Sequence, residues 1–234
     1  GGRIKDQEQT IGDYAGFISA EYEIIDQLIL RPGIRYSYNT SYKTPVTPSF
    51  HLKRDWKSYQ IRGSYSRGFR APSIKDLYFD FVDINHNITG NPNLIAESSN
   101  NFSASIKKSW RKKKRRYEWS VDGFYNQVNN LITLAQNEDS AYTYINLENY
   151  RTFGAVLGVE CTIKPFKISA ATSLIARYNA LSENLSVDPY SYSPEYRGSI
   201  GYEIKKAKLN ITLFYKYSGK VIAYYIGEEE KVEQ

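Results

Sequence analysis

Residues 117–126 read YEWSVDGFYN, a stretch in which apolar and polar side chains alternate. Because side chains two residues apart lie on the same face of a β-strand, this pattern predicts a strand with one apolar and one polar face. The apolar face carries Tyr117, Trp119, Val121, Gly123 and Tyr125. The polar face carries Glu118, Ser120, Asp122 and Asn126, and Phe124 is its one apolar exception.

The same alternation recurs along nearly the whole chain and predicts about ten antiparallel strands. A strand in a soluble sheet usually has about 5–6 residues, whereas a strand that crosses a bilayer needs about 9–11. Most of the predicted strands have room for 9–12 residues, which favours an all-β transmembrane barrel, although a sandwich with one wet face would also alternate. The strands lie near residues 12–22, 28–38, 47–54, 57–67, 97–109, 116–128, 141–164 (broken), 166–178, 193–204 and 207–218.

The connections between these strands alternate in length. The short ones lie near 25–26, 55–56, 109–115, 164–165 and 205–207, and the long ones near 39–46, 68–96, 129–150 and 179–192. Short turns on one side and long loops on the other are typical of bacterial outer-membrane barrels, whose long loops face outward. Aromatic residues near both strand ends indicate two interfacial girdles. These are Tyr117 and Trp119 at one end and Tyr125, Tyr215 and Tyr217 at the other.

The composition is consistent with a folded β-protein. Of 234 residues, 41% are apolar and 24% are charged, which excludes a disordered chain, and 22 are tyrosines. No run of about 18 apolar residues is present, so we expect no transmembrane helix. The single cysteine, Cys161, excludes an internal disulfide framework. Because the chain starts at Gly1 and has no methionine, we expect it to be processed, trimmed or a fragment.

One segment accounts for the basic charge of the chain. Residues 107–116 read KKSWRKKKRR, and subtracting these eight cations from the net charge of +6 leaves −2. A basic run flanked by Trp110 and Trp119 is also compatible with nucleic-acid binding. Its place at a short turn between two long strands favours a solvated hairpin turn near anionic lipid headgroups. We therefore expect outer-membrane lipid, and no nucleic acid, as its partner.

Two sequence blocks flank the longest connection. The first reads SYSRGFRAPSIKDLY at residues 64–78, and the second reads GNPNLIAESSN at residues 90–100. Together they resemble the TonB-dependent outer-membrane receptors, in which a strand ends Gly-Phe-Arg-x-Pro and the chain returns through Gly-Asn-Pro-x-Leu-x-Pro-Glu. Asp76 and Ala96 depart from the commoner Glu and Pro. The matching positions are Gly68, Phe69, Arg70, Pro72, Asp76, Leu77, Tyr78, Gly90, Asn91, Pro92, Leu94 and Glu97.

The resemblance implies that residues 1–234 are part of a larger barrel of the 22-strand type. The implied domain organisation is a partial barrel domain, truncated at both ends, without the plug domain and TonB-contacting segment of the family. The implied function is TonB-driven uptake of a scarce bulky ligand such as a ferric siderophore, haem or cobalamin. Its partners would be TonB, the receptor's own plug domain and an extracellular ligand. A passive porin, an adhesive barrel and a soluble all-β binding module stay open as alternatives.

The first block also invites local predictions. Gly68 would let the strand bend, Pro72 would end its ladder, and Ser73 would cap a short helical turn through Leu77. The resemblance suggests that Arg70 lies inside the barrel near plug or loop carboxylates. The alternative is a loop arginine that reaches water.

No catalytic constellation, cofactor site or metal site is predicted, so we expect a protein that is not an enzyme. His86 in the long loop is a weak candidate metal or haem ligand. Aromatic residues in the long loops are candidates for contact with a bulky ligand, although ordinary loop packing explains them equally well. The candidates are Tyr78, Phe79, Phe81, His86, Tyr142, Tyr144, Tyr190 and Tyr192.

Overall fold

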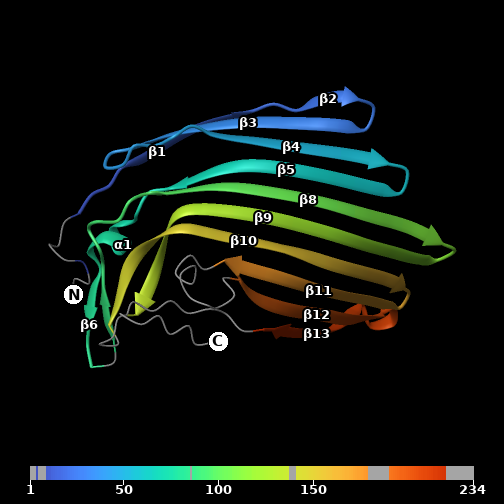
Figure 1. The fold of residues 1–234 in the computed structure, drawn as a ribbon. Coiled ribbons are helices and arrows are strands. Elements are labelled where there is room, and N and C mark those ends of the chain that lie inside the picture. Colours follow the sequence, from blue (N-terminus) through green and yellow to red (C-terminus); the bar gives the residue numbers. More distant parts are fainter. Residues whose placement is uncertain (1–3, 5–8, 85, 137–140, 179–189, 220–234) are drawn as a thin grey trace.

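The computed structural model describes residues 4, 9–84, 86–136, 141–178 and 190–219, which form one strongly curved antiparallel sheet (Figure 1). The main path through the sheet is β1-β3-β4-β5-β8-β9-β10-β11-β12-β13, so the prediction of about ten long antiparallel strands is confirmed. The elements are β1 Asp13–Ser19, β2 Tyr22–Ile25, β3 Leu28–Asn39, β4 Thr47–Trp56, β5 Tyr59–Arg70, α1 Ile74–Tyr78, β6 Asp80–Val82, β7 Asn87–Thr89, β8 Glu97–Lys112, β9 Arg115–Gln136, β10 Tyr142–Ile163, β11 Phe166–Tyr178, β12 Tyr190–Ile204, η2 Lys205–Ala207 and β13 Leu209–Ser218.

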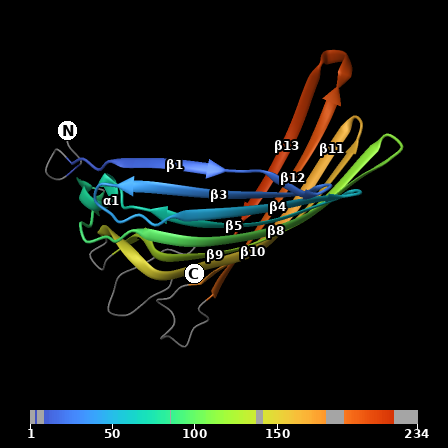
Figure 2. The same ribbon diagram turned by 90° about the horizontal axis from the view of Figure 1, so that it is seen from above.

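The sheet is open within the described residues, because its pairing runs from β1 to β13 and does not return. Seen from above, the strands fan steadily from β1 to β13, so that the two outer strands cross at a steep angle (Figure 2). This is the accumulated twist expected of a sheet that is part of a barrel wall. No helix of the described chain is both long and apolar enough to cross a membrane.

The strand register gives the sheet one apolar face. Residues that lie directly opposite each other in neighbouring strands share a face, and Phe102, Tyr125 and Phe153 are paired in this way across β8, β9 and β10. Ile18 and Leu213, which the register places on this face, are 75% and 73% exposed. So much contiguous apolar surface is unsuited to water and fits a lipid-facing wall. We call this face outward, and the polar concave face inward.

Aromatic side chains form two rows on the outward face, as predicted. On the side of the long loops, the ring centres of Tyr65 and Phe102 are 4.9 Å apart, and those of Phe102 and Tyr125 are 6.4 Å apart. On the side of the short turns, Tyr59 lies 6.4 Å from Trp119. Tyr65 lies six residues after Tyr59 in β5, which is about 20 Å along a strand. This separation suits the apolar band of a membrane barrel, which is about 25 Å tall.

Some predicted boundaries differ from the structure. The strand expected at 12–22 is divided into β1 and β2. Most of the loop expected at 129–150 is strand, because β9 and β10 stay paired from Ile163 to Tyr142. A positive φ of 57° at Asn130 marks the place in this long hairpin where the pair 130/148 drops out of the ladder. The strands also run further into the short turns than predicted, so the β8–β9 turn is Lys113–Lys114.

Candidate functional site

The two motif blocks meet at the loop side of the sheet. Strand β5 ends at Arg70 and pairs with β8, which begins at Glu97, so these two residues lie directly opposite each other. The long connection 71–96 therefore leaves and re-enters the sheet at neighbouring positions. Within it the structure contains α1, β6 and β7, which the sequence analysis expected only in part.

The helical turn α1 begins as predicted from Ser73. Its hydroxyl accepts a hydrogen bond from the Asp76 amide at 3.2 Å, and the Asp76 carboxylate accepts one from the Ser73 amide at 2.9 Å. This reciprocal capping box satisfies two amides that the start of a helix leaves without partners. Pro72, which precedes it, is fully buried and donates no backbone hydrogen bond, so it ends the ladder of β5.

Arg70 joins the two blocks through two carboxylates. Its guanidinium nitrogens lie 2.7 Å from Asp76 Oδ2 and 2.7 Å from Glu97 Oε1. The Asp76 and Glu97 side chains are only 6% and 13% exposed, whereas that of Arg70 is 45% exposed. Glu97 Oε1 also accepts the amide of Ile132 at 2.6 Å, which links the blocks to β9. Arg70 thus binds loop carboxylates, one of the partners that the resemblance suggested.

The second block packs on the backbone of α1. The Gly90 amide donates to the Phe79 carbonyl at 2.6 Å, and the Asn91 amide donates to the Asp76 carbonyl at 2.9 Å. A Cβ atom at position 90 would lie 2.6 Å from the carbonyl group of Leu77, closer than side chains approach a backbone. Gly90 is therefore required by close contact. At Gly68, by contrast, a Cβ would meet the Ser99 hydroxyl, a side-chain group that can rotate away.

A small apolar core lies beneath these contacts. Leu77, Leu94 and Ile132 are each less than 10% exposed and form one cluster. The cluster is extended by Ile11, Tyr42, Tyr78 and Tyr144. Together with the Arg70 ion pairs and the Gly90 contacts, it makes up what we call the loop clamp: Arg70, Ser73, Asp76, Leu77, Gly90, Asn91, Leu94, Glu97 and Ile132.

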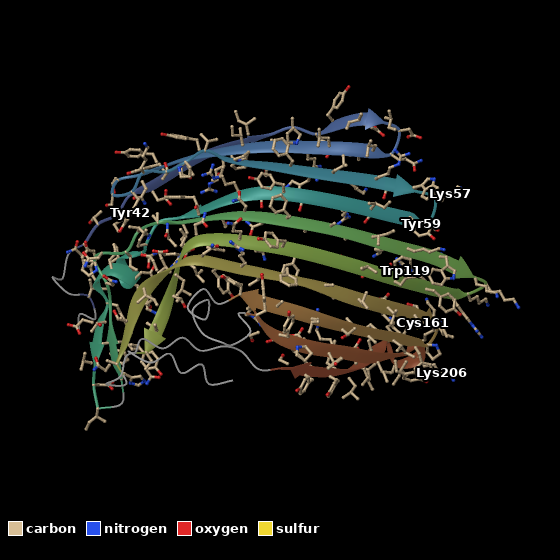
Figure 3. All side chains as sticks on the ribbon, viewed as in Figure 1. Tyr42, Lys57, Tyr59, Trp119, Cys161 and Lys206 are labelled. Carbon is tan, nitrogen blue, oxygen red and sulfur yellow. The ribbon has the colours of Figure 1, made fainter. Side chains whose placement is uncertain are left out.

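Tyr42 packs against the apolar cluster of the loop clamp, at the loop end of the sheet (Figure 3). Its hydroxyl donates to the Leu94 carbonyl at 3.2 Å. Burial and, second, the neighbouring Tyr78 raise the pKa of the Tyr42 phenol. The hydroxyl therefore stays protonated and remains a donor at any physiological pH.

The β9–β10 hairpin is a third partner that the sequence analysis missed. The Asn146 side chain donates to the carbonyls of Ile95 and Asn130 at 3.0 and 2.8 Å and accepts the Ile95 amide at 2.9 Å. The Asn91 side chain donates to the Tyr144 carbonyl at 2.9 Å. The available signal was the apolar run at 131–134, which does not suit the solvated loop that was predicted there.

The structure brings several candidate ligand-contact residues together. Phe81 lies between Phe79 and His86, with ring centres 6.0 and 4.9 Å apart, on the small β6–β7 hairpin. The His86 ring also contacts the Asp83 carboxylate at 3.0 Å. Tyr142 is paired with Ile88 of β7, at the edge of this hairpin. Tyr78 and Tyr144 instead pack on the loop clamp.

The two remaining candidates lie elsewhere. Tyr190 and Tyr192 were expected in a loop, but the structure places both in β12. Their register partners are Tyr178 and Ala176, and Ala176 is in turn paired with Phe153, so both tyrosines lie on the outward face. Tyr190 contacts the Phe153 ring at 5.5 Å and extends the aromatic row on the loop side.

The inward face is polar and hollowed. One cavity of about 750 Å³ lies against β3, β5 and the start of the long connection, and is lined by residues that include Arg35, Asn39 and Arg70. A second cavity of about 750 Å³ is lined by residues that include Arg31, His51 and Arg62. In the described parts of the chain, no group of three or more His, Cys, Asp or Glu side chains is placed to hold a metal ion.

Comparisons with known proteins agree with this architecture. The model of the TonB dependent receptor-like β-barrel family matches residues 2–229. The iron-regulated outer membrane virulence protein of Vibrio cholerae is 28% identical over 160 residues, which cover 61% of this chain and 24% of that protein. This chain thus spans about a quarter of that relative's length.

Two solved structures share the fold. The siderophore receptor PirA of Pseudomonas aeruginosa has a TM-score of 0.63 and 16% identity, over 89% of this chain and 38% of that one. The Serratia marcescens hemophore receptor HasR, solved with its hemophore and heme, has a TM-score of 0.65 and 13% identity, over 89% of this chain and 44% of that one. With the lipid-facing wall and the family match over nearly its whole length, this chain is an outer-membrane barrel chain that belongs to the TonB-dependent receptor β-barrel family.

Proposed function

We propose that this chain forms part of an outer-membrane receptor that takes up a scarce, bulky ligand with energy transmitted by TonB. An iron chelate is the ligand class that we favour. The Vibrio relative is named as iron-regulated, and the two structural neighbours are named as siderophore and hemophore receptors. Haem and cobalamin remain further predicted ligands of the same bulky class.

The observation that carries this proposal is the loop clamp. It holds the 71–96 connection in one place by two ion pairs, a capping box and a buried apolar cluster. A passive pore gains nothing from an ordered cover at its outer end. A receptor does, because preorganised loops reduce the entropy that ligand capture costs. We propose that Phe79, at the end of α1, and Phe81 and His86, on the β6–β7 hairpin, contact the ligand.

We further propose that other strands and a plug domain complete the receptor outside these 234 residues. Within the described residues, strands β1 and β13 have no partner along their outer edges, and such edges are not tolerated in lipid unless the barrel closes. The polar inward face and its two cavities would then receive the plug. TonB would act on that plug, so the mechanism needs no side-chain chemistry from this chain. The lipid-facing wall argues against the soluble alternative.

Uptake of radioactive ferric chelates by cells that lack the chromosomal gene tests the proposal. The full-length gene should restore uptake, and deletion of tonB should abolish it. Uptake that persists without TonB would instead support a passive porin, and the absence of any uptake with a panel of iron chelates would contradict the iron assignment.

Two matched variants test the ligand contacts. Phe81→Ala should raise the chelate concentration that gives half-maximal uptake, because Phe81 lies at the centre of the hairpin's aromatic group. Tyr192→Ala should leave it unchanged, because Tyr192 lies on the outward face. Equal effects of the two substitutions would exclude the hairpin as a ligand contact.

A further inference from the structure

The end of the β8–β9 hairpin carries cations on its outward face. Lys108 lies opposite Trp119 and Lys112 lies opposite Arg115, and alternation places all of them on the same face as Trp110 and Tyr117. We call Lys108, Lys112 and Arg115, with the rings of Trp110, Tyr117 and Trp119, the basic face. It lies on the turn side of the sheet, where Figure 3 shows Trp119 and its neighbour Tyr59.

The cations of the basic face differ from those on the inward face in their partners. On the inward face, Lys107 and Arg116 pair with Glu118 at 2.5 and 3.3 Å, and Lys167 pairs with Glu160 at 3.1 Å. For Lys108, Lys112 and Arg115, no carboxylate of the described residues lies within ion-pair distance. The acidic residues of β8 and β9 point inward, so the described residues supply no counter-ion to the basic face.

The aromatic rings fix the depth of this face in the membrane. The Lys108 ammonium lies 4.7 Å from the centre of the Tyr59 ring and 5.8 Å from that of Trp110. Trp110 and Tyr117 are stacked at 5.4 Å with an interplanar angle of 19°. Trp and Tyr rings of a barrel gather at the level of the lipid headgroups. The three cations therefore lie at or just beyond the headgroup level, above the apolar band.

The hairpin also leaves room for a headgroup. Its tip projects beyond the neighbouring β4–β5 turn (Figure 1). The Ser109 amide still donates to the Ser58 carbonyl, and the register between β5 and β8 ends at Lys108. Residues 110–112 of β8 therefore extend beyond their pairing with β5. This stretch carries Lys112, which faces outward opposite Arg115.

We propose that the basic face binds the phosphate headgroup of an anionic phospholipid, with the acyl chains lying along the apolar wall formed by Ile106, Val121 and Leu157. Charge complementarity selects the ligand, because the basic face lacks a carboxylate of its own and lies at headgroup depth. The proposal assigns a lipid site to the basic run that the transport function leaves unexplained, and it holds whichever ligand the receptor carries.

Native mass spectrometry of the complete receptor in micelles with equal amounts of phosphatidylglycerol and phosphatidylethanolamine tests this proposal. We expect phosphatidylglycerol to be retained at least about tenfold more often, since each cation near an anionic surface contributes about fivefold. The variant Lys108→Gln, Lys112→Gln, Arg115→Gln should lose this preference. The control Lys205→Gln, Lys206→Gln, Lys208→Gln removes the same charge from another short turn, where Figure 3 shows Lys206, and should keep the preference.

Equal retention of the two lipids by the unmodified receptor would overturn the proposal. So would an equal loss of preference in the two triple variants, which would show a general effect of rim charge. Heat-dependent mobility in gel electrophoresis reports whether each variant is a folded barrel. If the first variant does not fold, the charge-preserving Lys108→Arg, Lys112→Arg variant replaces it and should keep the preference. A loss of preference in that folded variant would also contradict binding by charge.

Discussion

Replacing Arg70 by alanine tests the loop clamp at its centre. The substitution removes both ion pairs at once and leaves the Asp76 and Glu97 carboxylates in a largely buried position. Each carboxylate keeps one backbone partner, because Asp76 accepts from Ser73 and Glu97 accepts from Ile132. We expect the 71–96 connection to open more often while the sheet below it stays folded.

The size of the effect follows from burial. A hydrogen bond to a charged group contributes about 1.5–3 kcal/mol, and leaving a charge buried adds to the loss. The Arg70 side chain is 45% exposed, so solvent screening lowers both contributions toward those of surface pairs. The two pairs together should therefore stabilise the closed connection by about 2–3 kcal/mol, which corresponds to an increase of about 30- to 150-fold in the open population.

Hydrogen exchange of the complete receptor, followed by mass spectrometry, measures this population directly. The informative amides are those of Leu77, Gly90 and Asn91, which donate within the loop clamp to the carbonyls of Ser73, Phe79 and Asp76. Their exchange rates should rise by the same factor as the open population. Amides in the middle of β8 and β9 should keep their rates, because global stability depends on the ladder.

Two further variants make the result specific. Arg67→Ala removes an arginine of the same strand that has no ion pair within the described residues, so exchange in 71–96 should not change. Arg70→Lys keeps the charge but loses the guanidinium fork, so its effect should be intermediate. A rise of less than about threefold for Arg70→Ala, or an equal rise for Arg67→Ala, would refute the role of the two ion pairs.

Three other substitutions probe the same region, each read out by exchange in 71–96 and by thermal unfolding. Gly90→Ala should destabilise the clamp by about 2 kcal/mol or more, because the new Cβ meets the backbone of α1, whereas Gly63→Ala, which meets nothing within 4 Å, should change stability by less than about 1 kcal/mol. Ser73→Ala removes the cap of α1 and should cost about 1 kcal/mol. Leu94→Ala leaves a cavity beside Leu77 and should cost about 2–5 kcal/mol. An unchanged protein in any of these cases would show that the contact concerned does not hold the connection.

The fold was predictable because a lipid-facing wall imposes a period of two on every strand. That period predicted the ten long strands of the main path and the two aromatic rows. The same period did not predict the ends of β9 and β10 that extend beyond the lipid-facing wall. The 131–136 and 142–147 segments pair with each other yet contact the loop clamp, so they follow no lipid-facing pattern, and the asparagines at 129, 130 and 146 read as a loop.

The site was predictable only in its local parts. The Ser73 cap follows from residues three apart, so the sequence alone predicted it. The Glu97–Ile132 and Asn91–Tyr144 contacts join segments 35 and 53 residues apart, and no local pattern signals them. Strand spacing in the sequence predicted that Tyr190 and Tyr192 lie in a loop. In the structure both belong to β12, and its register with β11 places them on the outward face.

The loop clamp also separates the motif residues of the family from the residues that we propose as ligand contacts. Arg70 is committed to Asp76 and Glu97, and Gly90 is committed to the backbone of α1, so these motif residues hold the connection and leave little of themselves for a ligand. The proposed ligand contacts Phe81 and His86, on the β6–β7 hairpin, take no part in these ion pairs or in the Gly90 contact. If the hairpin contacts the ligand as proposed, a change of ligand can be accommodated on it without disturbing the clamp. The motif blocks therefore predict the architecture and do not predict the ligand.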